Sequence, residues 1–462
     1  MDSAQDLIAT EHERIIASDK ASVWHHLTPQ GVSQKNDPMV MVSGKGMWVR
    51  DSVGRDFLDA TSGGVWTVNV GYGRSSIADA VRDQLVEMCF FGNSFGSVPG
   101  AHFAEQLLER LPGLGKVYYS NSGSEANEKA YKMVRQLAHV EGDGSRHKII
   151  YRDRDYHGTT IAALSSTGQS ERKAQYGPFV PGFSSFSHCC CYRCPFGKVY
   201  GECDIECARD LETAIQREGP DTVGAVVVEP ITAGGGVIVP VPEYFPIIRE
   251  ICDRYGILLH IDEVVCGLGR TGKWFGYQHF DVQPDIVTMA KGLASGYAAI
   301  SCTATTDDIH TRLNGSDRLH YFRDISTFGG CTAGPAAGLE TLRIIEDEKL
   351  LSNTSRMGIY LMDQLLALAE RHPLIGDVRG KGLFAGLELV ADRETRAPVD
   401  ESVAARVAAE CFAQGVLIGR TNRSFQEFNN TLCLSPALSA GKQELDTIVA
   451  ALDVALTTVE GG

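Results

Sequence analysis

The chain has 462 residues, of which 43% are hydrophobic and 22% charged, a composition typical of folded proteins large enough for two domains. The formal net charge of −15 repels nucleic-acid phosphates and anionic lipids, so neither is expected as a partner. The N-terminus shows no signal-peptide or transit-peptide pattern, and no apolar run approaches the length of a membrane span. We therefore expect a cytoplasmic protein.

A short β pattern lies near the N-terminus, and we expect residues 1–65 to form a segment that packs with the C-terminal part of the chain. From residue 66 to 335, apolar runs alternate with amphipathic stretches, which predicts an α/β layered domain. The runs are almost continuous in Val, Ile and Leu, as is typical of strands buried on both faces of a mainly parallel sheet. The predicted strands are 116–120, 147–151, 224–231, 256–264 and 285–290, and the clearest helix is 124–140.

The pattern changes after residue 335. A long helical stretch at 338–372 is followed by a strand pattern at 382–390 and a final helix at 442–459. These elements predict a smaller α+β domain at 336–462.

Two charged residues occur at the ends of consecutive predicted strands. Asp262 ends one strand, and Lys291 follows directly after the next. In parallel α/β sheets, ligands bind at the carboxyl edge of the strands. A lysine and a carboxylate at this edge suit pyridoxal 5′-phosphate (PLP), because the lysine forms a Schiff base with the cofactor and the carboxylate keeps the pyridine nitrogen protonated. We predict Lys291 and Asp262 as catalytic residues.

A turn of small residues, Ser122, Gly123 and Ser124, leads directly into the predicted helix. Because backbone N–H groups at a helix N-terminus bind phosphate, we expect this turn to hold the phosphate of the cofactor. Tyr156 follows another predicted strand and is suited to stack on the pyridine ring, and Val264 would close the opposite face.

Each of these features has an ordinary explanation when taken alone. A lysine at a strand end is usually a solvated charge, and a short Gly/Ser turn is a weak phosphate signal. Asp262 and Glu263 fit a surface acid pair, although a carboxylate inside an apolar run is costly to bury without a charged partner. The joint occurrence of lysine, carboxylate, turn and tyrosine favours a cofactor site. We interpret His157 and the glycines at 234–236 as structural.

The same residues resemble a known family. The run from Asp262 continues into G-x-G-R-T-G with Lys291 downstream, and SGSEAN, YHG, Glu-Pro at 229–230 and STFGG at 326–330 are also present. This set resembles the class III (ω) aminotransferases over almost the whole chain. The resemblance implies the PLP-dependent transferase fold type I (aspartate aminotransferase-like) with a seven-stranded sheet. It also implies a homodimer with shared active sites, a tetramer being left open, and ping-pong amino transfer to an oxo acid.

The resemblance implies roles for three further residues. Glu229 would lie over the substrate side of the cofactor ring, Thr327 would bind the phosphate of the partner subunit's cofactor, and Trp66 would line the pocket. On the sequence alone, Trp66 fits the core equally well, and Thr327 fits a polar turn.

Three stretches, 23–28, 191–208 and 427–438, resemble the taurine–pyruvate aminotransferases within this family. They imply that taurine is converted to sulfoacetaldehyde and pyruvate to alanine. The alternative is a broader ω-aminotransferase that uses β-alanine, 4-aminobutyrate or simple amines with pyruvate. Arg420 and Arg423 both lie in a loop suited to bind the substrate anion, and we prefer Arg420.

Other classes of function remain open at this point. An aminomutase or a decarboxylase on the same fold would turn over without an oxo-acid acceptor. A binding or regulatory protein on this fold normally lacks the lysine or carries an added DNA-binding segment, and neither is found in this sequence.

The 13 cysteines are interpreted as reduced thiols. Cys191 and Cys194 form a C-x-x-C pair, and Cys203 and Cys207 follow, which comes near the spacing of a structural zinc site. Related aminotransferases carry a similar segment as a surface loop, so we expect no metal.

Overall fold

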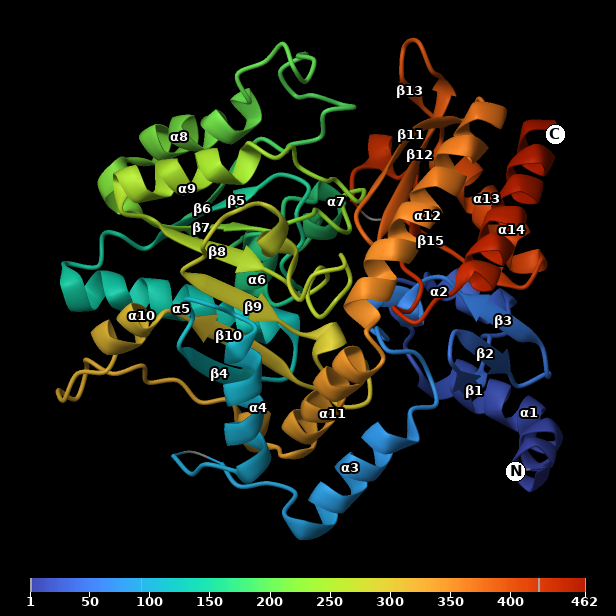
Figure 1. Ribbon diagram of the computed structural model, residues 1–462, viewed down its shortest axis with the longest axis horizontal. Helices are drawn as coiled ribbons and strands as arrows, with labels where there is room; N and C mark the ends of the chain where they lie inside the picture. Colours follow the sequence, from blue (N-terminus) through green and yellow to red (C-terminus); the bar gives the residue numbers. More distant parts are fainter. Residues whose placement is uncertain (1, 93, 423, 462) are drawn as a thin grey trace.

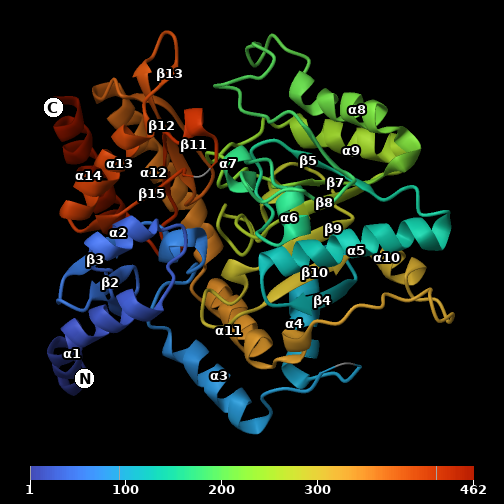
Figure 2. The same ribbon diagram turned by 180° about the vertical axis from the view of Figure 1, so that it is seen from behind.

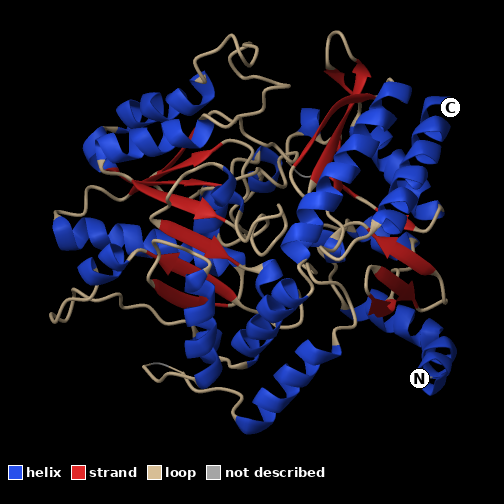
Figure 3. Ribbon diagram, in the orientation of Figure 1, coloured by secondary structure: helices blue, strands red, loops and turns tan. Residues whose placement is uncertain are grey.

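The structure is a computed structural model that describes residues 2–92, 94–422 and 424–461, without the side chains of residues 2–11, 30, 33, 34 and 426. One large sheet and two small ones occupy opposite sides of the molecule in Figure 1 and are drawn in red in Figure 3. Both termini lie on the side of the small sheets, as the reverse view in Figure 2 also shows.

The large sheet has seven strands in the order β4-β10-β9-β8-β7-β5-β6. Within the described residues, β10 alone runs antiparallel to its neighbours, and the other pairings are parallel. The predicted α/β fold with a mainly parallel seven-stranded sheet is confirmed. The strands are β4 Lys116–Ser120, β5 Lys148–Arg152, β6 Phe183–Phe186, β7 Val223–Val228, β8 Leu258–Asp262, β9 Ile286–Met289 and β10 Ser301–Thr305.

Alternate side chains of the central strands enter two separate cores. Ile149 and Val227 pack on one face of the sheet, whereas their neighbours Ile150 and Val226 pack on the other. Apolar residues are therefore needed at successive positions, which explains the continuous apolar runs in the sequence. The first face is covered by α5 Gly123–Glu141, α6 Ile161–Ser165 and α10 Asp307–Arg312, and the second by α4 Val98–Glu109, α8 Glu206–Glu218, α9 Tyr244–Tyr255 and α11 Ala333–Asp347.

The N-terminal segment and the C-terminal part share a core. β3 (Asp56–Asp59) pairs in parallel with β14 (Val416–Leu417), so one sheet has the order β1-β2-β3-β14. Leu58 packs in the same core as Leu361 and Leu452. This shared core supports the proposal that residues 1–65 pack with the C-terminal domain.

The second small sheet has the order β11-β12-β16-β15, and β13 pairs with β12. No helix in the described part of the chain has the length and apolarity needed to cross a membrane. The remaining elements are α1 Asp2–Ser22, α2 Gln30–Lys35, β1 Met41–Lys45, β2 Trp48–Asp51, α3 Ser75–Glu87, α7 Ser170–Lys173, α12 Leu350–Arg371, β11 Ile375–Gly380, β12 Ala385–Asp392, β13 Ala397–Pro398, α13 Glu401–Ala413, β15 Gly419–Arg420, β16 Thr431–Leu434 and α14 Lys442–Gly461.

The long helix predicted at 338–372 is two helices. α11 ends at Asp347 and α12 begins at Leu350, because Lys349 adopts a left-handed conformation with a φ of 54°. A non-glycine residue in that region interrupts the helical hydrogen-bond ladder. α11 packs on the large sheet, and most of the buried face of α12 packs in the C-terminal core.

Arg270 joins three segments of the chain. Its side chain is fully buried, and Nη1 donates to the carbonyls of Leu383 (3.1 Å) and Pro436 (2.5 Å). Nη2 donates to Ser62 Oγ (3.0 Å) and Asn69 Oδ1 (2.8 Å). Burial lowers the pKa of Arg270 to about 10, so the guanidinium stays charged at neutral pH. The arginine of the G-x-G-R-T-G run therefore ties the N-terminal and C-terminal segments to the large sheet.

Replacing Arg270 with methionine should lower the free energy of unfolding by about 3 kcal/mol, because buried acceptors lose their donor. Denaturant titration of the purified protein measures the change. Arg82→Met is the control, since Arg82 is exposed and pairs with Asp79 and Asp83 at the surface. Equal stability of the two variants would contradict the structural role of Arg270.

Candidate active site

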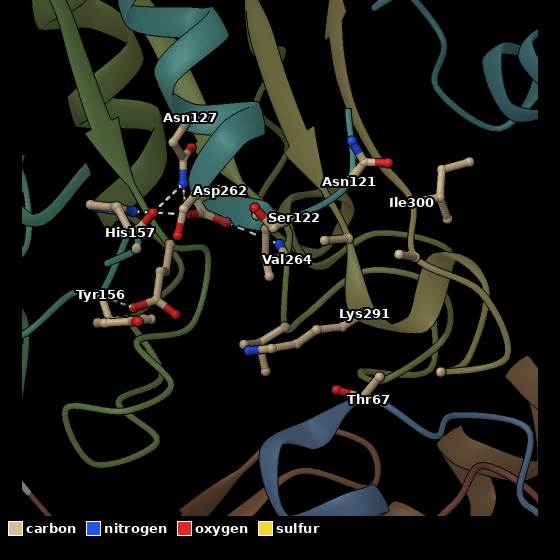
Figure 4. A pocket seen from close by; sticks show the side chains of 18 of the residues that line it. Thr67, Asn121, Ser122, Asn127, Tyr156, His157, Asp262, Val264, Lys291 and Ile300 are labelled. Carbon is tan, nitrogen blue, oxygen red and sulfur yellow. Dashed lines mark hydrogen bonds and ion pairs between the residues drawn. The ribbon is translucent and has the colours of Figure 1, made fainter. Parts of the chain in front are cut away.

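A cavity of about 460 Å³ lies at the carboxyl edge of the large sheet (Figure 4). It is bounded by the ends of β4, β8 and β9 and by the N-terminus of α5. This volume is typical of small-molecule sites. The structure brings together most of the residues predicted from the sequence, and those that line the cavity are Ser122, Gly123, Ser124, Tyr156, Glu229, Asp262, Val264 and Lys291.

The carboxylate of Asp262 is buried at the end of β8 and accepts three hydrogen bonds. Oδ2 accepts from His157 Nδ1 and from Asn127 Nδ2, both at 2.8 Å, and Oδ1 accepts from the backbone N–H of Val264 at 3.0 Å (Figure 4). Burial acts to raise the pKa of Asp262, but the contacts with His157, Asn127 and Val264 outweigh it, and the pKa is lowered. Asp262 therefore remains ionised at neutral pH.

The sequence interpretation missed the two side chains that hold Asp262. Asn127 is fully buried, its Nδ2 also donates to the carbonyl of His157 at 2.7 Å, and its Oδ1 accepts from Thr288 Oγ1 at 2.9 Å. The bond from Thr288 fixes the orientation of the amide, so the NH₂ group faces Asp262. His157, which we interpreted as structural, contacts Asp262 directly. In the sequence, the available signal for this contact was Asn127, an amide residue one turn inside the predicted helix, at the end of SGSEAN.

The N-terminus of α5 faces the cavity through small residues. Ser122 is the N-cap, and its Oγ accepts from the backbone N–H of Glu125 at 3.3 Å. A Cβ on Gly123 would lie 2.9 Å from Val264 Cγ2, so the close approach of α5 to the loop after β8 requires glycine. The first N–H groups of a helix have no partner within the helix and carry a partial positive charge, which makes this edge an anion site.

Lys291 follows β9 and starts a short 3₁₀ turn, Lys291–Leu293. Its φ of 45° is in the left-handed region, a strained conformation that recurs at functional sites. Nζ lies 5.2 Å from the centroid of the Trp66 ring. Burial lowers the pKa of Lys291, although Glu229 and Asp262 act to raise it. An amine with a lowered pKa has more of the neutral form that acts as nucleophile and base.

Glu229 and Tyr156 form another part of the cavity wall. Glu229 Oε1 accepts from the backbone N–H of Tyr156 at 2.8 Å, and Oε2 accepts from that of Ala233 at 3.0 Å. Burial, together with the charges of Asp155 and Asp262, raises the pKa of Glu229 well above its usual value. The guanidinium of Arg172 lies 4.9 Å from the centroid of the Tyr156 ring, a cation–π contact that helps to orient the ring.

The remaining predicted residues lie outside this cavity lining. Trp66 contacts Phe384 and precedes Thr67, which does line the cavity. Arg420 is in β15 and pairs with Glu401 Oε1 at 2.6 Å. Thr327 is exposed at the start of the short helix Thr327–Gly330. Arg423 lies outside the described residues.

The cysteines at 191–207 lie close together in the structure. Cys191 and Cys194, with Cys203 and Cys207, are free thiols around a small apolar space. No group of three or more His, Cys, Asp or Glu side chains among the described residues has the arrangement needed to hold a metal ion.

Comparisons with known proteins show which family this chain resembles over nearly its whole length. Residues 30–456 match the family described as aminotransferase class-III. The hypotaurine/taurine–pyruvate aminotransferase of Paracoccus denitrificans is 58% identical over 98% of this chain and 99% of its own length. The taurine–pyruvate aminotransferase of Rhodobacter capsulatus is 59% identical over 96% of both chains. Among solved structures, a Bacillus anthracis aminotransferase superposes with a TM-score of 0.93 at 39% identity, covering 97% of this chain and 99% of that one.

Asn127→Ala should raise the dissociation constant for PLP about tenfold, because Asp262 loses a charge-assisted hydrogen bond worth about 1.4 kcal/mol. Titration of the apoprotein with PLP, followed by absorbance, measures this constant. Asn353→Ala is a matched control, since Asn353 donates to the carbonyls of Leu438 and Ala440 away from the cavity. It should lower stability and leave PLP affinity unchanged. Unchanged PLP affinity in Asn127→Ala would contradict the role given to Asp262.

Proposed function

Because the chain belongs to the class-III aminotransferases, we propose that it transfers the amino group of taurine to pyruvate, giving sulfoacetaldehyde and alanine. The family membership makes it a PLP-dependent enzyme of fold type I. The observation that carries the choice of taurine is the 57–59% identity, over nearly the full length, to curated relatives named for this reaction. The two half-reactions would follow a ping-pong order.

The cavity fits PLP. The N-terminus of α5 would hold the phosphate, Asp262 would pair with the pyridine nitrogen, and Tyr156 and Val264 would contact the two faces of the ring. When bound, PLP supplies an electron sink that stabilises negative charge on the amine-bearing carbon of the substrate. An ionised carboxylate held by three donors is suited to keep that sink protonated.

We assign the proton transfers to Lys291. Its Nζ would move the proton that leaves the amine-bearing carbon of taurine to the C4′ atom of PLP, and in the second half-reaction it would return a proton from C4′ to the carbon that becomes the α-carbon of alanine. The lowered pKa of Lys291 supports this role, because it increases the share of the neutral amine that accepts a proton. Glu229 lies beside this path, and its raised pKa favours a neutral carboxyl that does not repel anionic substrates.

Both substrates carry an oxyanion, the sulfonate of taurine and the carboxylate of pyruvate. A guanidinium binds either group with two parallel hydrogen bonds. We keep Arg420 and Arg423 as the proposed clamps. The pair between Arg420 and Glu401 is partly exposed, and such pairs contribute at most about 1 kcal/mol, so a substrate anion can displace Glu401.

We also propose a homodimer with shared active sites. Thr327, the proposed contact to the partner's phosphate, is next to exposed apolar side chains that a second subunit would cover. Phe90 and Cys331 pair through an isolated antiparallel β-bridge of the backbone. This pairing places exposed Phe91 near exposed Phe328. A cytoplasmic location stays a prediction from the sequence.

Taurine should give the highest rate in a panel of donors with pyruvate as acceptor, at least about tenfold above β-alanine, 4-aminobutyrate and simple amines, as expected if the sulfonate adds about 1.4 kcal/mol of transition-state binding. Alanine formation measures every reaction in the same way. A β-alanine or amine rate equal to that of taurine would favour the broader ω-aminotransferase. Turnover without any oxo-acid acceptor would show a different reaction class.

Arg420→Ala should raise the KM for pyruvate by about 10- to 100-fold, the loss expected for a bidentate contact to a carboxylate. PLP affinity should not change. Glu401→Gln is the matched variant, because it releases Arg420 from its ion pair and should keep or lower KM. An unchanged KM in Arg420→Ala would assign the clamp to Arg423.

A further inference from the structure

Arg154 is a buried cation for which the described residues supply no hydrogen-bond acceptor at Nε or Nη1. It lies in the loop after β5 and is 2% exposed, and its Nε and Nη1 are buried with no acceptor among the described residues. Its φ of 74° is in the left-handed region, which a non-glycine residue adopts only at a cost. Burying an unpaired charge costs several kcal/mol, so this arrangement calls for an anion close to the guanidinium.

The neighbouring carboxylates already form ion pairs with other arginines. Glu388 is fully buried and accepts hydrogen bonds from both Arg193 and Arg379, the latter at 2.7 Å. Arg379 also binds Asp377 at 2.6 Å. Burial lowers the pKa of Arg154, and the positive charges of Arg379 and Arg193 add to this effect. The cluster therefore has three guanidinium groups and two carboxylates, which leaves one positive charge without a counterpart.

Arg154 lines a second cavity, of about 340 Å³, separate in its lining residues from the cavity at Lys291. The guanidinium carbon lies 5.8 Å from the ring centroid of Phe425 and 5.1 Å from that of Phe428, and both rings line the same cavity. Arg154 therefore borders this space, with its guanidinium beside two apolar rings. The volume is sufficient for an organic ion of amino-acid size.

The other titratable groups that line the cavity do not cancel this charge. Lys173 adds a second cation, and its Nζ donates to Tyr151 Oη at 3.0 Å. His188 is neutral, because burial and the charge of Arg154 lower its pKa to about 3. Asp153 also lines the cavity, and burial raises the pKa of its carboxyl; even when ionised, it offsets only one of the two cations. The cavity therefore has a net positive charge.

We propose that this second cavity binds a small oxyanion, a sulfonate, carboxylate or sulfate group, through the guanidinium of Arg154 with Lys173 beside it. Phe425 and Phe428 would contact any apolar part of the ligand. Both rings belong to the loop that follows Arg420, so an anion at Arg154 would hold this loop in place. The site is independent of which amino donor the enzyme uses. The bound oxyanion would be either an organic anion of the reaction or inorganic sulfate.

Selenate, an analogue of sulfate with a strong anomalous signal, locates the site directly. Crystals of the PLP-loaded enzyme soaked in selenate should show a selenium peak within hydrogen-bond distance of the Arg154 guanidinium. A saturating soak with selenium peaks elsewhere and none at Arg154 would overturn the proposal. This experiment needs no variant and does not depend on activity.

Thermal unfolding of the loaded enzyme tests the same site in solution. Sulfate, ethanesulfonate or acetate should raise the Tm of the wild type, because an anion that binds only the folded state stabilises it. Arg154→Met should lose most of this rise, Arg154→Lys should keep part of it, and Arg82→Met should keep all of it. A larger rise with ethanesulfonate or acetate than with sulfate identifies an organic ligand. Equal rises in Arg154→Met and wild type would contradict the proposal.

Discussion

A carboxylate buried at the end of a parallel strand stays ionised only if donors surround it, and the arrangement around Asp262 meets this requirement. His157, Asn127 and the backbone of Val264 supply three hydrogen bonds, and together they outweigh the effect of burial. The carboxylate then has its remaining interactions directed at the cavity, where a cation is expected. The proposed pairing with a protonated pyridine ring, and with it the chemistry assigned to Lys291, depends on this charge.

The parallel sheet brings the other parts of the site to the same edge. Asp262 ends β8, Lys291 follows β9, and α5 begins just after β4, so one edge collects a carboxylate, an amine and a helix N-terminus. Gly123 lets α5 approach Val264 more closely than any other residue allows. Arg270 then fixes the N-terminal and C-terminal segments against this edge. The positions of the groups therefore follow from strand order and a few close contacts.

The sequence predicted the fold and the main cavity residues because they depend on local patterns. Continuous apolar runs mark strands buried on both faces, and Asp262 and Lys291 lie at strand ends that the runs define. Contacts between distant segments were harder to predict. The bond from His157 to Asp262 depends on how two loops meet, and the pair of Arg420 with Glu401 depends on the packing of β15 beside α13. The break at Lys349 has no glycine or proline to mark it. The antiparallel strand β10 was not predicted, because its polar residues Ser301, Thr303 and Thr305 are also common in turns.

The most direct test of the account is to find which amine holds the cofactor. Sodium borohydride reduces the bond between PLP and the amine that carries it, and mass spectrometry of the digested protein then locates the added mass. The account predicts a single labelled peptide, the one that contains Lys291, with no label in Lys291→Ala. A label on another lysine, or no covalent label in the loaded wild type, would contradict it.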